Sequence, residues 1–367
     1  MYRSEETQLI KSENLCINLS FLLDNPTGIS TYALNILPYL KDLKPNLLTH
    51  QSFAGYTCHP IPKDLTAKQG IRGHINRIFW MQFKVQQICT KIKANLFFSP
   101  LPEAPLNSRH KTIITVHDLI PLRFPRLSPA LTYYYRYYVP LVLNQASHIL
   151  CNSVTTANEV MHRFGISANK ITPTPLACNT QHFIPLNLPS KNYFLYFGRH
   201  SPYKNIHRLI TAFSKLPKSS DVELWVAGPY DYRYTRALQH YVQDLDLESS
   251  IKFLDYVSYK QLPILINEAI AVIFPSLWEG FGLPVIESMA CGTPVIASNI
   301  AAFPETVGDA AILVNPLNID EIFDAIKIVM NEEQTRSVLR AQGLLRVKKF
   351  SWEKTGRATN EILSRYM

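Results

Sequence analysis

The sequence predicts an α/β protein built from two doubly wound parallel sheets. Short apolar runs alternate with segments of helical periodicity throughout the second half, and less regularly in the first half. The chain has 367 residues, which is enough for two domains that each bury their own core. Residues 184–192 are rich in proline and polar side chains, as expected of a linker. We therefore place a domain boundary there, with domains at 1–186 and 187–350 and a separate terminal segment at 351–367.

The second half gives the clearest pattern. Its expected strands are 193–197, 223–228, 251–254, 271–275, 295–298 and 311–314. Its expected helices are 206–216, 233–246, 259–269, 284–291 and 318–330. Ligands of such sheets bind beyond the carboxyl ends of the strands, so the loops 198–205 and 276–284 should converge on one ligand.

The first half is also α/β. Its expected strands are 15–21, 47–53, 95–99, 112–117, 148–152 and 170–175. A helix at 29–43 follows a turn that contains Gly28, and a tyrosine-rich helix is expected at 129–143. The stretch 54–78 has poor periodicity, and we expect it to be a loop or a mobile segment.

Composition indicates a globular protein of the cytoplasm. Hydrophobic residues make up 47% and charged residues 18%, and no apolar run reaches the roughly 18–20 residues that span a bilayer. The N-terminus is polar and has no apolar signal-peptide core. The six cysteines are scattered without a C-x-x-C pair, which favours reduced thiols over disulfides or a zinc site.

The net charge of +9 lies entirely in the first half. Residues 1–190 hold 18 lysines and arginines against 9 acidic residues, whereas residues 191–367 hold 19 of each. Solubility alone would explain this excess. An alternative is that the first domain meets a lipid-linked diphosphate or an anionic membrane face. Nucleic acid is not expected as a partner, because no nucleic-acid motif and no basic stripe with interleaved aromatics is present.

The most informative segment is Trp-Glu-Gly-Phe-Gly-Leu-Pro-Val-Ile-Glu at 278–287. It follows a buried strand, contains a glycine turn and opens a helix at Pro284. Free backbone N–H groups and the positive end of a helix favour a phosphate above such a turn. Glu279 and Glu287 would face the same crevice and accept hydrogen bonds from hydroxyls. Phosphate together with hydroxyls indicates a sugar nucleotide.

This segment resembles the E-x7-E signature of retaining glycosyltransferases of family 4, which have the GT-B fold. Residues 197–205 look like the diphosphate-binding loop of that family, and Val-His-Asp-Leu-Ile-Pro at 116–121 looks like its histidine loop. The stretches 292–298 and 304–311 are similar to the family's sequence on the C-terminal side of the signature. The resemblance implies two Rossmann-like domains facing each other across a cleft. The first would bind the acceptor and the second the nucleotide sugar, with 351–367 as a helix that packs back on the first domain.

The resemblance also implies roles for individual residues. The expected catalytic residues are His117, Arg199, Lys204 and Glu279, and the expected substrate-binding residues are Gly28, Asp118, Gly280, Phe281, Gly282, Leu283 and Glu287. Arg199 and Lys204 would stabilise the leaving diphosphate. Glu287 would bind the ribose, and Glu279 and His117 the donor sugar. The family's usual paired glycines are reduced to Gly28 here, which weakens the expectation of a phosphate contact there; an N-capping turn is the alternative.

The expected reaction is transfer of a hexosyl group from GDP-mannose or a UDP-hexose to an acceptor hydroxyl, with no metal or other cofactor. The acceptor would be a lipid-linked oligosaccharide of a surface polysaccharide or a small molecule, and the enzyme cytoplasmic or peripheral at the inner membrane face. Asp244-Leu245-Asp246 has the letters of a metal-binding D-x-D, but it falls in a predicted helix away from the motif loops. A nucleotide-sugar epimerase and a catalytically degenerate GT-B subunit are the competing interpretations. The first needs further acid/base carboxylates, and the intact motif residues argue against the second.

Overall fold

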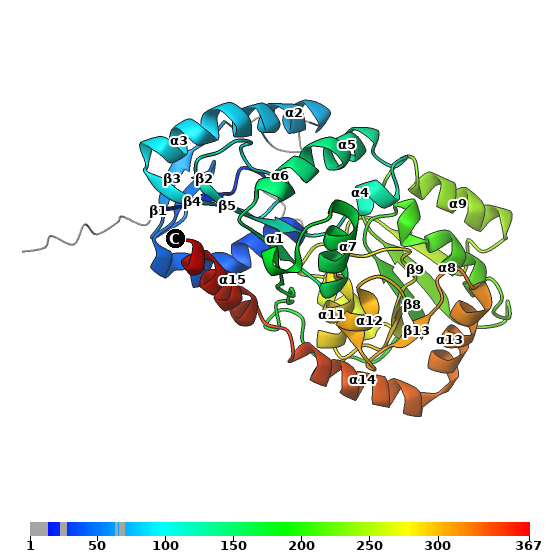
Figure 1. Cartoon of the computed structure of the whole chain (residues 1–367). Coiled ribbons are helices and arrows are strands. Elements are labelled where there is room, and N and C mark those ends of the chain that lie inside the picture. Colours follow the sequence, from blue (N-terminus) through cyan, green and yellow to red (C-terminus); the bar gives the residue numbers. More distant parts are fainter. Residues whose placement is uncertain (1–13, 23–27, 63–64, 66–69) are drawn as a thin grey trace, which may run out of the picture.

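The computed structural model describes residues 14–22, 28–62, 65 and 70–367, and it contains two parallel sheets (Figure 1). The first sheet has the order β3-β2-β1-β4-β5-β6-β7 and the second β10-β9-β8-β11-β12-β13. The strands of the first sheet are β1 (Asn14–Asn18), β2 (Asn46–Thr49), β3 (Thr57–Pro60), β4 (Ala94–Ser99), β5 (Lys111–Val116), β6 (His148–Cys151) and β7 (Ile171–Pro173). Those of the second are β8 (Tyr193–Phe197), β9 (Glu223–Ala227), β10 (Ile251–Leu254), β11 (Ala271–Phe274), β12 (Val295–Ser298) and β13 (Ile312–Val314).

Helices cover both sheets. Those of the first half are α1 (Gly28–Ile36), α2 (Gly70–Trp80), α3 (Gln86–Lys91), α4 (Ile120–Arg123), α5 (Pro129–Tyr133), α6 (Val139–Gln145) and α7 (Val154–Phe164). Those of the second half are α8 (Ile206–Phe213), α9 (Thr235–Asp244), α10 (Leu262–Glu268), α11 (Leu283–Ala290), α12 (Phe303–Val307), α13 (Ile319–Asn331), α14 (Glu333–Val347) and α15 (Trp352–Tyr366). Both halves are Rossmann-like, as the sequence predicts.

The strands form where the sequence has continuous apolar runs. Every residue of β8, β11 and β12 is buried, because helices cover both faces of the second sheet. All the strand pairs in this sheet are parallel. This arrangement explains why the strands of the second half can be predicted from the sequence pattern alone.

One expectation for the first half is wrong. The stretch 54–78 is not simply a loop, because it contains β3 and most of α2. Strand β3 lies at the sheet edge with half-exposed side chains, so it lacks an apolar run. The helix expected at 129–143 is present, and it consists of α5, a π-helical turn at Tyr134–Tyr138, and α6. Pro140 lies in the first turn of α6, where it cannot donate a helical hydrogen bond, and this accounts for the interruption.

The last helix crosses back onto the first half, as expected. Helix α15 lies beside α1 in Figure 1 and packs on it and on the 3-10 segment Leu37–Leu43. Asn360 Nδ2 donates to the carbonyl of Tyr39 at 2.7 Å, and Lys111 Nζ donates to the carbonyl of Tyr366 at 2.9 Å. The C-terminal segment is therefore part of the first domain's packing.

Strand order fixes where a ligand can bind. The strand order reverses once in each sheet, between β1 and β4 in the first and between β8 and β11 in the second. Open α/β sheets bind ligands beyond the carboxyl ends of the strands at such a switch point. In the second sheet these ends carry the segments 198–205 and 275–282, where the sequence predicts the loops 198–205 and 276–284.

Candidate active site

The two motif loops of the second sheet converge. The backbone N–H of Leu277 donates to the carbonyl of Tyr203 at 2.7 Å, and Asn205 Nδ2 donates to the carbonyl of Pro275 at 2.9 Å. These bonds place Lys204 beside Glu279, with Nζ and Oε1 2.5 Å apart. Their side chains are only 15% and 13% exposed. A cation and a carboxylate are therefore held together at the carboxyl edge of the sheet.

The charge state of this pair follows from its surroundings. Burial alone would lower the pKa of Lys204, but the attraction of Glu279 outweighs it and the pKa is raised. Lys204 is therefore charged throughout the physiological range. Arg199 lies on the same loop and is exposed, and its guanidinium forms no ion pair with any residue in the described ranges. The loop thus carries one cation held in an ion pair, Lys204, and one exposed cation, Arg199.

The glycine loop presents its backbone, not its side chains, to the cleft. The ring of Phe281 is buried against Phe350, with ring centroids 5.5 Å apart. Gly282 has a φ of 94°, and a Cβ there would lie 2.7 Å from Cε1 of Phe303. Both properties require glycine at that position. Leu283 begins α11, and its Cδ1 would lie 3.7 Å from a Cβ on Gly28. Gly28 therefore begins α1 opposite this loop, whereas the expected turn at 25–27 lies outside the described residues.

Glu287 lies in α11 behind the glycine loop and is partly buried. Burial raises the pKa of its carboxyl to about 7. No side chain or backbone N–H within the described part of the chain donates to this carboxylate. Among the described residues this acceptor has no donor, which suits a ligand that brings hydroxyl donors.

His117 and Asp118 follow β5 on the opposite side of the cleft. His117 Nε2 lies 2.9 Å from the carbonyl of Pro100, which can only accept, so Nε2 carries the proton. Burial lowers the pKa of His117 to about 4, so the ring is neutral at physiological pH and Nδ1 is left as an acceptor. The rings of Tyr32 and His117 form a T-shaped pair with a centroid distance of 5.0 Å.

Asp118 connects the two sides electrostatically. Its Oδ1 accepts from the backbone N–H of Ile120 at 2.9 Å. Burial, and to a smaller extent the charge of Glu279, raises the pKa of its carboxyl to about 6. A Cβ on Gly280 would lie 3.0 Å from the Cβ of Asp118 and inside van der Waals contact with the carbonyl of His117. The histidine loop and the glycine loop therefore touch, which brings His117 and Asp118 of the first half next to Gly280 of the second.

Comparison with known proteins identifies the chain. A model described as Glycosyltransferase Family 4 matches residues 26–182, and one described as Glycosyl transferases group 1 matches residues 179–346. O-antigen chain mannosyltransferase B of Escherichia coli is 31% identical over 256 residues, which cover 66% of this chain and 67% of the relative. The chain belongs to glycosyltransferase family 4. O-antigen chain mannosyltransferase RfbU of Salmonella typhimurium is 36% identical over 228 residues, or 59% of this family 4 chain and 63% of the relative.

Solved structures give the same fold. Sucrose-phosphate synthase from Thermosynechococcus elongatus superposes with a TM-score of 0.77 over 96% of this chain and 98% of that one, at 18% sequence identity. At that identity the likeness concerns the fold alone. The family 4 protein therefore has the GT-B architecture.

The structure of this family 4 protein also shows contacts that the sequence analysis missed. The carboxylate of Glu305 accepts from the backbone N–H groups of Val154 and Thr155 at 3.0 and 2.9 Å, so a residue of the second half caps helix α7 of the first. Thr156 Oγ1 lies 3.4 Å from the carbonyl of His117 and 3.3 Å from that of Gly280. Glu305 falls within the stretch 304–311, but no local pattern indicates a partner 150 residues away.

A further contact between the halves lies beside Glu279. The guanidinium carbon of Arg123 sits 3.2 Å from the centroid of the Trp278 ring, and Arg123 Nε donates to Glu159 Oε1 at 2.7 Å. Cation–π contacts of this kind hold a planar guanidinium against an indole face. Trp278 directly precedes Glu279, so the first domain fixes the start of the motif.

The structure also bears on the D-x-D letters, on metal binding and on membrane spans. Asp244 and Asp246 lie at the end of α9, away from the motif loops, and Asp246 has a φ of 54°. Within the described ranges, no three His, Cys, Asp or Glu side chains are grouped so that they could hold a metal ion. Among the helices that the structure describes, none combines the length and apolar character needed to cross a bilayer.

Proposed function

We propose that this family 4 enzyme transfers a mannosyl group from GDP-mannose to a hydroxyl of a lipid-linked oligosaccharide in surface polysaccharide synthesis. Two relatives at 31% and 36% identity are named as O-antigen chain mannosyltransferases, which supports a mannosyl group and this pathway. The observation that carries the transferase activity is the Lys204–Glu279 pair, which lies at the switch point of the second sheet and opposite His117 and Asp118.

The donor would lie over the glycine loop. Its diphosphate would meet Lys204 and the exposed Arg199, with the backbone of Gly280–Leu283 and the N-terminus of α11 beside it. The unpartnered carboxylate of Glu287 would accept from the ribose hydroxyls. The positive charges of Lys204 and Arg199 would take the role that a metal ion plays elsewhere, so we propose that no metal is required.

The reaction would proceed with retention at the anomeric carbon. The bond between that carbon and the diphosphate oxygen breaks, and the acceptor oxygen attacks from the same face. The acceptor's proton passes to a donor phosphate oxygen. Negative charge grows on the diphosphate as the bond breaks, and the preorganised Lys204 stabilises it more in the transition state than in the ground state. Nδ1 of the neutral His117, together with Glu279, would hold hydroxyls of the mannosyl ring.

The acceptor would enter from the first domain. That half of the sequence carries the whole positive excess, which suits a lipid diphosphate or the anionic inner face of the membrane. The enzyme would therefore act in the cytoplasm, in peripheral contact with the membrane. A UDP-hexose as donor and a small-molecule acceptor are the alternatives to this substrate pair.

The test is nucleotide release by the purified chain from a panel of GDP-, UDP- and ADP-sugars. We expect slow hydrolysis of GDP-mannose that Lys204→Ala and Glu287→Ala both abolish. Lys215→Ala is the matched control, because it removes a lysine whose ion pair with Asp320 lies on the exposed surface. Release from a UDP-sugar alone would change the donor. Silence with every sugar, together with no nucleotide-induced rise in Tm, would identify a degenerate binding subunit and overturn the proposal.

A further inference from the structure

A polar groove lies between helix α7 of the first domain and the start of the signature segment 278–287 in the second. Its volume is about 600 Å³, within the range of about 300–1,000 Å³ that is usual for small-ligand pockets. Arg123 and Trp278 line one side. The other side is one face of α7, formed by side chains at helical spacing: Asn158, Glu159, His162 and Arg163. Both domains therefore contribute to the groove.

Glu159 is the buried charge of this groove. Its side chain is 7% exposed, and its Oε1 accepts from Arg123 Nε at 2.7 Å. Nη2 of Arg163 lies farther from the same oxygen, at 3.9 Å. The other oxygen, Oε2, is buried and has no hydrogen-bond partner among the described residues. Buried polar atoms in folded proteins are nearly always hydrogen-bonded, so Oε2 indicates that a ligand of the groove supplies a donor.

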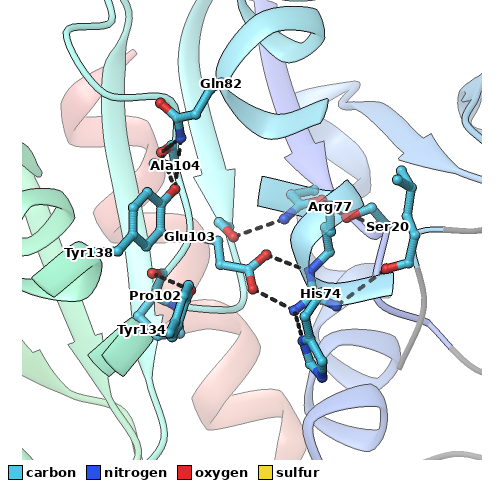
Figure 2. Close-up of polar contacts among 12 residues, drawn as sticks. Ser20, His74, Arg77, Gln82, Pro102, Glu103, Ala104, Tyr134 and Tyr138 are labelled. Atoms are coloured by element: carbon cyan, nitrogen blue, oxygen red, sulfur yellow. Dashed lines mark hydrogen bonds and ion pairs between the residues drawn. The ribbon is translucent and has the colours of Figure 1, made fainter. Parts of the chain in front are cut away.

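A polar cluster elsewhere in the first domain shows the opposite case, in which side chains satisfy one another. Gln82 Nε2 donates to the hydroxyl of Tyr138 at 2.9 Å and to the carbonyl of Ala104 at 3.1 Å (Figure 2). Arg77 and Glu103 form a buried ion pair, with Nη2 and Oε1 2.6 Å apart. These groups are satisfied without a ligand, whereas the buried carboxylate oxygen of the groove is not.

The groove also offers donors that are available to a ligand. The side chains of Asn158 and His162 are exposed, and neither forms a hydrogen bond or an ion pair with another described residue. Trp278 is half-buried, and its indole Nε1 likewise has no acceptor among the described residues. The guanidinium of Arg123 holds the indole in place, with its carbon 3.2 Å from the ring centroid. An amide, an imidazole, an indole and a carboxylate therefore surround one space.

This set of groups matches a carbohydrate. Sugar hydroxyls both donate and accept, so they can give a hydrogen bond to Glu159 Oε2 and receive others from the amide and the indole. A phosphate or a carboxylate would instead meet the negative charge of Glu159. From Thr155, which also lines the groove, to Arg163 is eight positions, or about 12 Å along the helix axis. That length exceeds one hexose ring and favours an oligosaccharide.

The groove adjoins the reaction centre. Trp278 directly precedes Glu279 in the sequence. Burial is the main cause of the raised pKa of Asp118, and the negative charge of Glu159 adds to it, so the two carboxylates lie near each other. A sugar chain in the groove would therefore have one end beside Glu279 and Asp118.

We propose that the groove between α7 and Trp278 binds the acceptor as a neutral oligosaccharide of at least two sugar units. Glu159 accepts from a hydroxyl of the chain, Asn158 and His162 hold a neighbouring unit, and the terminal hydroxyl lies at the reaction centre. The assignment of this chain as acceptor rests on the proposed function, whereas sugar binding in the groove does not. It selects an oligosaccharide over a small-molecule acceptor.

The experiment is calorimetric titration of the full chain, without donor, with a linear α-linked mannotriose and with mannose. We expect mannotriose to bind at least about ten-fold more tightly than mannose. Asn158→Ala with His162→Ala should weaken mannotriose binding at least about ten-fold, because two hydrogen bonds are lost. The matched control is Asn331→Ala with His240→Ala, which removes the same residue types from exposed positions of the second domain and should leave the affinity unchanged.

Tryptophan fluorescence locates the binding independently of these variants. Mannotriose should change the fluorescence of the wild type, and Trp278→Phe should remove most of that change. No binding of mannotriose, equal affinity for mannose, or an unchanged affinity in the Asn158/His162 variant would overturn the inference.

Nucleotide release from the sugar nucleotides separates this inference from the proposed function. Release without mannotriose binding would leave the transferase standing and overturn the groove as its acceptor site. Mannotriose binding as expected, with no release from any sugar nucleotide, would establish the carbohydrate site and contradict the transferase.

Discussion

Replacing Gly280 with alanine tests whether the contact between the two domains sets the geometry of the reaction centre. Gly280 follows Glu279, begins the backbone that we assign to the donor, and touches the histidine loop of the first domain. An alanine Cβ would lie 2.1 Å from the carbonyl oxygen of His117 and 3.0 Å from the Cβ of Asp118. Ordinary contacts between carbon atoms are about 3.5–4.0 Å. Because the contact with the carbonyl oxygen is shorter still, the two loops would have to separate by at least about 1 Å.

A displacement of about 1 Å in a reaction centre can reduce the rate on the order of 100-fold. We therefore expect Gly280→Ala to lower kcat/KM by about that factor in transfer and in donor hydrolysis. Nucleotide affinity should change much less, because Glu287 and Lys204 keep their positions in the second domain. Steady-state nucleotide release gives the rate, and calorimetric titration with nucleotide gives the affinity.

The control is Gly165→Ala, at the end of α7. Gly165 has a φ of 66°, and a Cβ there would meet nothing within 4 Å, so alanine strains the backbone without a new contact. It should cost about 1 kcal/mol of stability and leave kcat/KM unchanged. If Gly280→Ala retains more than half of the wild-type rate, the domain contact does not set the reaction geometry. A loss of rate that Gly165→Ala reproduces would attribute the effect to stability instead.

Four further outcomes are expected. Lys204→Ala should lower kcat by about 10²–10³, because the diphosphate loses a preorganised cation, and Lys204→Arg should retain part of the lost rate. Nucleotide release measures both rates. A wild-type rate in Lys204→Ala would contradict the role assigned to Lys204. The pKa of Glu287 is raised to about 7, so nucleotide binding should become tighter as pH rises through that value, because the ionised carboxylate is the better acceptor. Calorimetry should find that Glu287→Gln binds nucleotide more weakly than the wild type and with an affinity that does not change with pH. The pKa of Glu287 in the folded state, about 7, exceeds its ordinary value of 4.5, so the folded state binds more protons between these two values and the free energy of unfolding should fall as pH rises from 4.5 to about 7. Urea unfolding of Glu287→Gln should lack this fall. A variant with the same pH profile as the wild type would refute the linkage. Deleting residues 351–367 removes the buried Trp352 and Leu363 and should lower Tm by at least about 10 °C in a thermal melt, whereas an unchanged Tm would contradict the packing of α15 on the first domain.

Much of the fold is predictable because strands that are buried on both faces appear in the sequence as continuous apolar runs. The fully buried strands β8, β11 and β12 are apolar runs bounded by glycine or proline, so their limits emerge within a residue or two. Strand β3 escapes prediction because an edge strand with half-exposed side chains has no apolar run. The π-helical turn at Tyr134–Tyr138 escapes it because it continues the helical periodicity on either side.

The site divides in the same way. The motif residues are local, and the strand-loop-helix pattern around Glu279 and Glu287 places them at the edge of the sheet. The ion pair between Lys204 and Glu279 is not local, since it depends on two backbone bonds that bring their loops together. The contacts of Glu305 with α7 and of Arg123 with Trp278 cross between domains, and periodicity carries no information about such pairs.

The most direct test of the central claim is the anomeric configuration of the product formed from GDP-α-mannose. Proton and carbon NMR of the extended acceptor, with Lys204→Ala in parallel, reports donor, transfer and stereochemistry in one spectrum. We predict an α-mannoside that the wild-type enzyme forms and the variant does not. A β-mannoside would contradict same-face attack. No mannoside, with transfer from another nucleotide sugar or from none, would contradict the proposed function.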